Sequence, residues 1–487
     1  MSVSVARAIA FDILVRVESE GAYASDLLHA ELGASDQSRA AKIKPEDAAL
    51  ATEITLGVLR WRRLLDFLLA SQLKKPVDRL DLPVAIALRM GLYQLRFLQR
   101  IPARAAVNES VELIKRAKKS SAAALVNAVL RRAAANTDGF PSPASLGKRS
   151  KASGPPARRD SDKRITLLSA ADRLATLHSH PTWLVERWLA RFGEDRTLAL
   201  LDANNRAPRL SCALHDPAHR DQIFASLQNG GLRVEPGALL KNGFAITGGS
   251  ITRTQVFREG VISIQDEASQ VIPLLLDTHA GDRVLDLCAA PGGKTPPLAR
   301  AAGPKGLVIA ADRHAHRLRA MRAQFDRLHL DEVQIVEVDA EKPLPFTYKF
   351  DRILVDAPCS GTGTLARHPE IRWRLRPEQL AEFHRLQVAI LTSALDALAP
   401  GGRLVYSTCS LEPEENEMVI ARVLDQHPRD LSHVTPTKSV ATLGQYLADG
   451  IAASSLFDRE GFFRTFPGIH RTDGFFAAIL VKRSEAG

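Results

Sequence analysis

The spacing of apolar residues near the start of the chain is that of amphipathic helices. Apolar residues recur at intervals of three and four in ARAIAFDILVRV, LATEITLGVLRWRRLLDFLLASQL and LPVAIALRMGLYQLRFL, and again in AAVNESVELIKRA and SAAALVNAVLRRAAA. This spacing places them on one face of each helix, so residues 3–135 are predicted to form an all-α bundle. Pro45, Pro83 and Pro102 stand near the predicted helix starts, where proline is tolerated. The bundle pattern alone indicates no chemistry.

The pattern changes twice after the bundle. Phe140–Arg164 is rich in Pro, Ser, Gly and basic residues and has no periodicity, so it is predicted to be a flexible, solvated linker. From about residue 170 a helical pattern, HPTWLVERWLARFG, precedes short strand patterns, APRLSCALHD, GLRVEP and FAITGG. These predict a small α+β subdomain, with Cys212 as a core residue of one strand.

From about residue 260 strand and helix patterns alternate. The predicted strands are Val284–Cys288, Leu307–Asp312, Val333–Asp339, Phe350–Asp356 and Arg403–Thr408, and Phe475–Arg483 is a candidate edge strand. Helical stretches such as HAHRLRAMRAQFDRL lie between them. This alternation predicts a Rossmann-like, doubly wound parallel sheet. The expected segments are therefore a helical domain (1–140), a basic linker (141–165), an α+β subdomain (166–258) and an α/β domain (259–487).

Composition narrows the class of protein. The chain has 487 residues and 45% hydrophobic content, which is ordinary for a globular protein of two to four domains. It has no apolar run of 18 residues, and its N-terminus enters an amphipathic pattern at once, so we expect a cytoplasmic protein without a membrane span. Four cysteines without a CxxC pair argue against a zinc site or a disulfide framework, and we expect no metal.

The positive charge is unevenly distributed. Of the net +10, residues 1–140 carry +6 and residues 141–165 carry +5, whereas the remainder carries −1. Such a division suggests a polyanionic partner held by the N-terminal region, with solubility alone as the competing explanation.

The segment LDLCAAPGGKT, Leu285–Thr295, has the character of a ligand-binding loop. A strand pattern runs into small residues and then a helix, so glycine backbone and unpaired N–H groups are available to a ligand. Neither the phosphate-binding GxxxxGK[ST] nor the dinucleotide GxGxxG pattern is present. Asp312, Asp339 and Asp356 end the next three strand patterns, and acidic residues at consecutive strand ends suit a hydroxylated, aminated cofactor.

Two cysteines follow strands instead of lying inside them. Cys359 stands in DAPCSGTG and Cys409 in YSTCSLEPEEN. In a doubly wound sheet the fourth and fifth strands are neighbours close to the first, so these thiols are expected to face each other beside the cofactor. Their Pro, Ser and Thr neighbours favour function over a structural role, and a redox disulfide is the less favoured alternative.

Together, CAAPGGK, DAPCSG and STCSLEPEENE resemble the bacterial ribosomal-RNA cytosine-5 methyltransferases of the Sun family. The resemblance extends over nearly the whole chain, including an N-terminal bundle similar to the NusB antitermination fold and the closing TDGFFAAIL. It implies an enzyme that methylates C5 of a cytosine in small-subunit (16S) ribosomal RNA, with S-adenosylmethionine as cofactor. It also implies RNA-binding roles for the helical domain and the α+β subdomain. A monomer is expected, since no coiled-coil signal is present.

The resemblance also implies residue roles. Cys409 would be the nucleophile that adds to C6 of cytosine, and Cys359 would assist release of the product. Asp356 would hydrogen-bond the base, and Lys294 would lie beside the base or the cofactor. The residues that would hold S-adenosylmethionine are Cys288, Ala289, Ala290, Pro291, Gly292, Gly293, Lys294, Asp312, Asp339 and Asp356.

One departure and three alternatives remain. Pro296-Pro297 follow the loop where the family is expected to have other residues, and they are predicted to fall in the first helical turn. A transfer-RNA cytosine-5 methyltransferase has the same motifs. A non-catalytic RNA-binding or antitermination protein is disfavoured because it needs neither thiol. A DNA cytosine methyltransferase is disfavoured because its attacking thiol typically stands in the fourth-strand Pro-Cys segment.

Overall fold

The computed structural model describes residues 3–32, 43–135, 165, 167–428, 430–434 and 436–484. The chain forms two compact units. Unit 1 comprises Met1–Arg206 and Leu365–Arg374, and unit 2 comprises Ala207–Thr364 and Leu375–Gly487. The predicted linker, residues 141–165, lies outside the described residues except for Ile165.

Unit 1 begins with the predicted helical bundle. Its main helices are α1 (Val5–Glu20), α2 (Ala24–Leu32), α3 (Pro45–Ala70), α4 (Leu82–Phe97), α5 (Ala103–Arg116) and α6 (Ala123–Ala135). Proline stands in the first turn of α3 and of α4, and Pro102 precedes α5. The apolar faces meet in one core that includes Leu14, Ile54 and Leu130, each at most 1% exposed. The bundle prediction is therefore confirmed.

Two further helices complete this bundle. They are α9 (Ala170–Leu177) and α10 (Thr182–Asn204), and α10 is interrupted at Gly193, whose φ is +76°. Arg63 of α3 holds both helices against α3. Its guanidinium donates to Thr176 Oγ1, to the His180 carbonyl and to Thr182 Oγ1. Helix α10, which the sequence pattern assigned to the α+β subdomain, therefore packs within unit 1.

The segment Leu365–Arg374 also belongs to unit 1, although it follows the Cys359 loop along the chain. Arg372, in the short helix α16 (Ile371–Arg374), is fully buried. Its guanidinium donates to the carbonyls of Arg60, Ser179, Asn204 and Leu365 and to Asn205 Oδ1, at 2.8–3.3 Å. One arginine therefore joins α3, the turn before α10 and the end of α10 to this segment.

Unit 2 contains a small antiparallel sheet of order β2-β3-β1-β4. Its strands are β1 (Leu210–Leu214), β2 (Arg233–Pro236), β3 (Gly243–Gly248) and β4 (Ile262–Ile264), with helices α11 (Arg220–Asn229) and α12 (Gln255–Arg258). Cys212 is fully buried in its core beside Phe244, as predicted.

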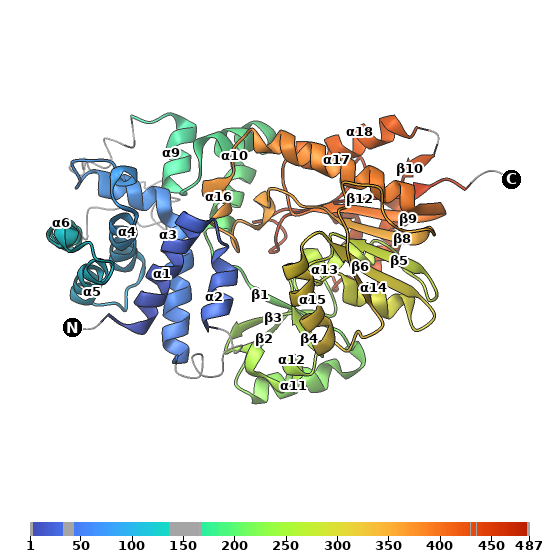
Figure 1. Cartoon of the computed structure of the whole chain (residues 1–487), viewed down its shortest axis with the longest axis horizontal. Coiled ribbons are helices and arrows are strands. Elements are labelled where there is room, and N and C mark those ends of the chain that lie inside the picture. The colour runs from blue at the N-terminus through green and yellow to red at the C-terminus, as the bar shows by residue number, and fades with distance from the viewer. Residues whose placement is uncertain are drawn as a thin grey trace. The chain divides into compact units, whose positions relative to one another are not determined.

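The larger sheet of unit 2 has the order β10-β12-β9-β8-β5-β6-β7 (Figure 1). Its strands are β5 (Arg283–Leu287), β6 (Leu307–Asp312), β7 (Gln334–Glu337), β8 (Phe350–Asp356), β9 (Leu398–Thr408), β10 (Leu431–His433) and β12 (Phe475–Lys482), and β11 (Phe463–Thr465) pairs with β12. Strands β5 to β9 pair in parallel, which confirms the doubly wound prediction. The expectation that β12 forms an edge is wrong, because β10 and β11 cover it on the side away from β9, and its Phe475–Leu480 stretch is buried accordingly.

Helices cover both faces of this sheet, as the buried clusters show. Helices α13 (Glu267–Leu274), α14 (Thr295–Ala302) and α15 (Ala315–Arg327) pack on one face, where α19 (Pro436–Gly444) also contributes. Helices α17 (Gln379–Ala397) and α18 (Glu417–Gln426) pack on the other. Neighbouring residues of a strand alternate between the two cores: Val284 lies in one and Leu285 in the other.

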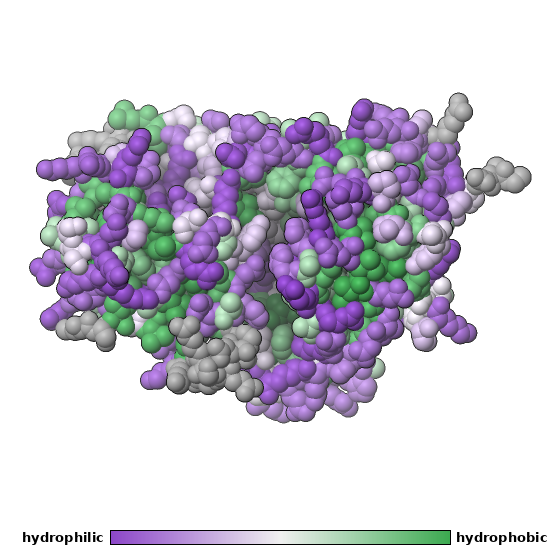
Figure 2. All heavy atoms as spheres, viewed as in Figure 1, coloured by the Kyte–Doolittle hydropathy of each residue, from purple (hydrophilic) through white to green (hydrophobic). Residues whose placement is uncertain are grey.

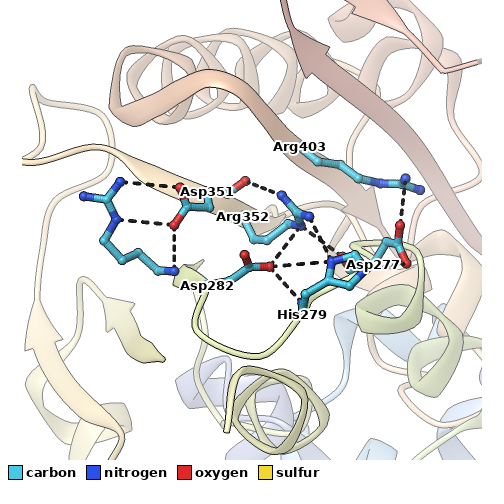
Figure 3. A network of polar contacts seen from close by, with 7 residues as sticks. Asp277, His279, Asp282, Asp351, Arg352 and Arg403 are labelled. Atoms are coloured by element: carbon cyan, nitrogen blue, oxygen red, sulfur yellow. Dashed lines mark hydrogen bonds and ion pairs between the residues drawn. The ribbon is translucent and has the colours of Figure 1, made fainter. Parts of the chain in front are cut away.

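A network of charged side chains closes the amino-terminal end of the sheet (Figure 3). Arg283, at the start of β5, pairs with Asp351 of β8, and Arg352 lies 3.3 Å from Asp282 and 3.1 Å from His279. These contacts fix the loop before β5 to β8. The network lies at the opposite strand ends from both cysteine loops.

Hydrophilic residues are spread over the face drawn in Figure 2, with apolar residues scattered between them. In the part of the chain that the structure describes, no helix is both long and apolar enough to cross a membrane.

Candidate active site

The candidate active site lies at the carboxyl ends of the parallel strands of unit 2. Strand β8 pairs with β5 on one side and with β9 on the other. The loops after β5, β8 and β9 therefore meet at one edge of the sheet, which is where ligands bind in such folds. These loops carry the CAAPGGK segment, Cys359 and Cys409 respectively.

The two thiols lie side by side. The Sγ atoms of Cys359 and Cys409 are 3.4 Å apart, both residues are partly exposed, and both are free thiols. The amide of Gly363 donates to the Cys409 carbonyl at 2.9 Å, which joins the two loops. The contact with Cys409 and burial raise the pKa of Cys359 well above its usual value, so Cys359 is held as the neutral thiol.

Lys294 and Asp356 form an ion pair beside the thiols. The Nζ of Lys294 lies 2.5 Å from Oδ2 of Asp356, and the Ser407 hydroxyl donates to Oδ1 at 2.8 Å. Burial lowers the pKa of Lys294, but the charges of Asp356, Cys409 and Asp286 outweigh it, so that its pKa is raised overall. Lys294 is therefore an ammonium at neutral pH, 5.3 Å from the ring centre of Phe475.

The CAAPGGK segment forms a tight turn between β5 and α14. Cys288 has a φ of +68°, an uncommon value for a residue with a side chain, and the Ala290–Pro291 peptide is cis. The amide of Ala289 donates to the Ala311 carbonyl at 2.8 Å, and Arg317 of α15 donates to the Ala290 carbonyl at 2.9 Å. Pro296 and Pro297 fall in the first turn of α14, as predicted.

Gly292 is required by the shape of this turn. Its φ is +94°, and a Cβ at this position would lie 2.7 Å from Met321 and 2.8 Å from Phe325. Glycine thus lets the loop pack closely against α15.

The predicted acidic residues line the same edge. Asp312 ends β6 and is 4% exposed; its carboxylate accepts from the amides of Ala290 and His314. Asp339 follows β7, the neighbour of β6, and a hydrogen bond from Lys342 lowers its pKa. Asp339 is therefore a carboxylate at neutral pH, the form that accepts hydrogen bonds from hydroxyl or amino groups.

Asp286, in the middle of the site, was not singled out from sequence. It is fully buried, its Oδ2 accepts from the Thr295 hydroxyl at 2.7 Å, and its Oδ1 has no hydrogen-bond partner among the described residues. Burial raises its pKa to about 7. An unpartnered acceptor among several carboxylates fits a cofactor that carries a cationic, hydrogen-bond-donating group.

Other residues of the site were also missed. Ser407 precedes the TC pair but gave no signal, because serine at a strand end is common. Glu415 was quoted within SLEPEEN without a role, yet it is buried between the thiol loops. Among the described residues, no group of three or more His, Cys, Asp or Glu side chains is arranged to hold a metal ion.

Comparison with known proteins identifies the family. The model of the 16S rRNA methyltransferase RsmB/F family matches residues 273–481, the NusB family model matches residues 4–135, and the RsmF/B-like ferredoxin-like domain model matches residues 180–251. The probable ribosomal RNA small subunit methyltransferase B of Bacillus subtilis is 32% identical over 98% of both chains. The chain belongs to the RsmB/F family.

Further relatives agree. The ribosomal RNA small subunit methyltransferase B of Pseudomonas putida is 34% identical over 82% of this chain and 86% of its own. The crystal structure of PH0851 superposes with a TM-score of 0.77 at 24% identity over 99% of both chains, which shows a shared fold. A methyltransferase homologue from Pyrococcus horikoshii matches at 30% identity and a TM-score of 0.53, over 65% of this chain and 100% of its own. Membership of the family confirms the predicted resemblance, enzyme class and cofactor: the protein is an S-adenosylmethionine-dependent methyltransferase.

Proposed function

We propose that this protein methylates C5 of one cytosine in 16S ribosomal RNA and that Cys409 attacks the base. The observation that carries the proposal is the pair of thiols, 3.4 Å apart, beside the Lys294–Asp356 ion pair. The names of the relatives, which are small-subunit ribosomal RNA methyltransferases, support the choice of RNA.

The residue types suit the chemistry of the cytosine ring. C5 is a weak nucleophile, and addition of a thiolate to C6 makes it enamine-like. When bound, S-adenosylmethionine supplies the methyl group. Loss of the C5 proton to a base then expels the sulfur of Cys409 from C6 and restores the ring. Two groups assist: Asp356 holds the ring nitrogen as it gains a proton, and Lys294 holds Asp356 in place through their ion pair.

The two thiols have different roles in this proposal. Cys409 is the attacking group, and its sulfur lies 3.4 Å from that of Cys359. Cys359 stays protonated because the contact with Cys409 and burial raise its pKa. A thiol with its proton, at contact distance from the sulfur that must leave, is suited to assist release of the methylated RNA.

The remaining residues would bind cofactor and substrate. Cys288 to Lys294, Asp286, Asp312, Asp339 and Asp356 would hold S-adenosylmethionine. The target base must leave any stack to reach both the sulfur and the methyl group. The helical domain (1–140), the basic linker (141–165) and the α+β subdomain (166–258) would bind RNA outside the site, and the enzyme would act in the cytoplasm as a monomer.

Bisulfite sequencing of total RNA from cells with and without the gene tests the substrate. One cytosine of 16S ribosomal RNA that loses protection only in the deletion supports the proposal. Loss of protection at a cytosine of a transfer RNA would identify transfer RNA as the substrate. No loss of protection at any cytosine would contradict the proposed reaction.

Two cysteine variants test the mechanism. We expect Cys409→Ala to abolish methylation and Cys359→Ala to accumulate a covalent RNA–protein adduct, visible as a denaturant-resistant band. The reverse pattern would exchange the roles of the two thiols.

A further inference from the structure

The residues that follow the two cysteines bind the same buried carboxylate. Ser360 follows Cys359, and Ser410 follows Cys409. Both hydroxyls contact Oε1 of Glu415, the Ser410 hydroxyl at 2.6 Å. All three of these residues are at most 5% exposed. One carboxylate oxygen thus joins the loop after β8 to the loop after β9.

The second oxygen of Glu415 binds only the Cys359 side. Oε2 accepts from the amide of Ser360 at 2.7 Å and from Nε2 of Gln387 at 3.1 Å. The same Gln387 nitrogen donates to the carbonyl of Pro358 at 2.9 Å. Cys359 is therefore flanked on both sides by residues that this network fixes.

The direction of these hydrogen bonds follows from the neighbours. The amide of Glu412 donates to the Ser410 oxygen at 3.0 Å, so the Ser410 hydroxyl proton is available to Glu415. Ser360 N–H and the Gln387 amide can only donate. Four donors converge on the carboxyl group of Glu415, and they oppose the rise in its pKa that burial causes.

The backbone of Glu415 is fixed as well. Its carbonyl accepts from the hydroxyl of Tyr406, in β9, at 2.7 Å. Its neighbour Asn416 accepts from the Thr408 hydroxyl and donates to the Ser410 carbonyl at 2.9 Å. The Glu415 carboxylate therefore projects from a turn that hydrogen bonds fix to β9 and to the Cys409 loop.

We propose that Glu415 is a positioning residue whose carboxylate sets the separation between Cys359 and Cys409. Its catalytic consequence rests on the function proposed above, because attack by one sulfur and release assisted by the other require both at one base. The carboxylate charge also acts on Cys359, whose pKa it helps to raise after the larger effects of Cys409 contact and burial.

A reagent that bridges two thiols measures this separation without RNA. Phenylarsine oxide binds a close pair of thiols through one arsenic atom, and its affinity depends on how well the two sulfurs are held together. The Cys359→Ala and Cys409→Ala variants define the affinity of a single thiol. Glu415→Gln is the test, and Glu382→Gln, an exposed residue of α17, is the matched control.

We expect the dissociation constant of phenylarsine oxide to rise about tenfold or more in Glu415→Gln and to stay unchanged in Glu382→Gln. In single-turnover methyl transfer, the Glu415→Gln rate should fall about tenfold to a hundredfold while the dissociation constant of S-adenosylmethionine stays within about twofold. Unchanged arsenical affinity in a folded Glu415→Gln protein would overturn the proposal, whatever its activity.

The two proposals fail separately. A weakened arsenical affinity together with no methyl transfer by the wild-type protein would contradict the proposed function and leave the role of Glu415 standing. If Glu415→Gln does not fold, Ser410→Ala removes one of the four donors and should raise the arsenical dissociation constant severalfold. Wild-type affinity in Ser410→Ala would then count against the proposal.

Discussion

The ammonium of Lys294 lies 2.5 Å from the carboxylate of Asp356, and this pair connects two loops of different origin. Lys294 closes the CAAPGGK loop after β5, and Asp356 ends β8, directly before the Cys359 loop. Their side chains are only 12% and 28% exposed. The pair thus links the predicted cofactor site to the cysteine loops. A substitution of Lys294 or Asp356 should therefore affect both the cofactor site and the thiols.

Replacing Asp356 with Asn should cost both stability and activity. The ammonium of Lys294 would keep its burial but lose its counter-charge. Breaking a buried pair costs about 3–5 kcal/mol, and partial exposure of Asp356 reduces this to about 1–3 kcal/mol. Because Asp356 also contacts the base in the proposed mechanism, the methylation rate should fall at least about a hundredfold. Urea unfolding and initial rates measure the two effects.

The double variant Lys294→Met, Asp356→Asn separates them. It removes the unpaired charge, so we expect it to recover part of the lost stability but none of the activity. Strictly additive losses of unfolding free energy would mean that the two side chains do not interact.

Alanine at Gly292 should disrupt the CAAPGGK loop, which we propose holds the cofactor. The residue has a φ of +94°, and its new Cβ would collide with Met321 and Phe325. We expect a loss of about 2–4 kcal/mol in unfolding free energy and an S-adenosylmethionine affinity, measured by calorimetry, that is weaker by about tenfold or more. Gly303→Ala is the control, because its φ is +63° but its Cβ would meet no described atom within 4 Å. Equal cofactor affinities in the two variants would contradict the role of this turn.

Lysine in place of Arg372 should release the segment Leu365–Arg374 from unit 1. A lysine cannot reach the carbonyls of α3, α10 and the preceding turn at once, so buried acceptors would lose their partners. We expect a loss of about 2–4 kcal/mol in unfolding free energy and faster hydrogen exchange of the amides in this segment. Arg376→Lys, at an exposed position, should change neither. Unaltered exchange in Arg372→Lys would show that other contacts hold the segment.

Much of unit 2 could be predicted because its strand, helix and loop patterns are local in the sequence. Strands β6 and β8 have the predicted bounds, and β9 was predicted from Arg403 although it begins at Leu398. The first residues of β9 include Pro400, Gly401 and Gly402, and this sequence is typical of a turn. The approach of Cys359 to Cys409 followed from strand order alone, since both follow neighbouring parallel strands.

Contacts between segments that are distant in the sequence could not be predicted. The SLEPEEN motif holds three glutamates, and only the short helical turn Pro413–Glu415 decides that Glu415 points at Ser360, 55 residues away. The attachment of Leu365–Arg374 to unit 1 depends likewise on Arg372 meeting carbonyls more than 160 residues distant. Neither contact leaves a periodic pattern in the chain. The roles of the site residues remain predictions for the variants above.

Asp286 should make the stability of the protein depend on pH. In the unfolded chain the pKa of an aspartate is about 3.9. Burial raises the pKa of Asp286 to about 7 in the folded protein. Between these values the folded state binds more protons than the unfolded state, so this group's contribution to the free energy of unfolding falls as pH rises through the window and stays low above it. Asp286→Asn keeps an oxygen for the Thr295 hydroxyl and carries no charge. We therefore expect the Asn variant to gain stability relative to wild type by about 1 kcal/mol per pH unit between about pH 4 and pH 7, and no further above. Guanidinium unfolding at pH 5, 6, 7 and 8 provides the measurement. If the difference in unfolding free energy between the two proteins is constant across that range, Asp286 is ionised throughout. Its unpartnered oxygen would then require a cationic neighbour even before the cofactor binds.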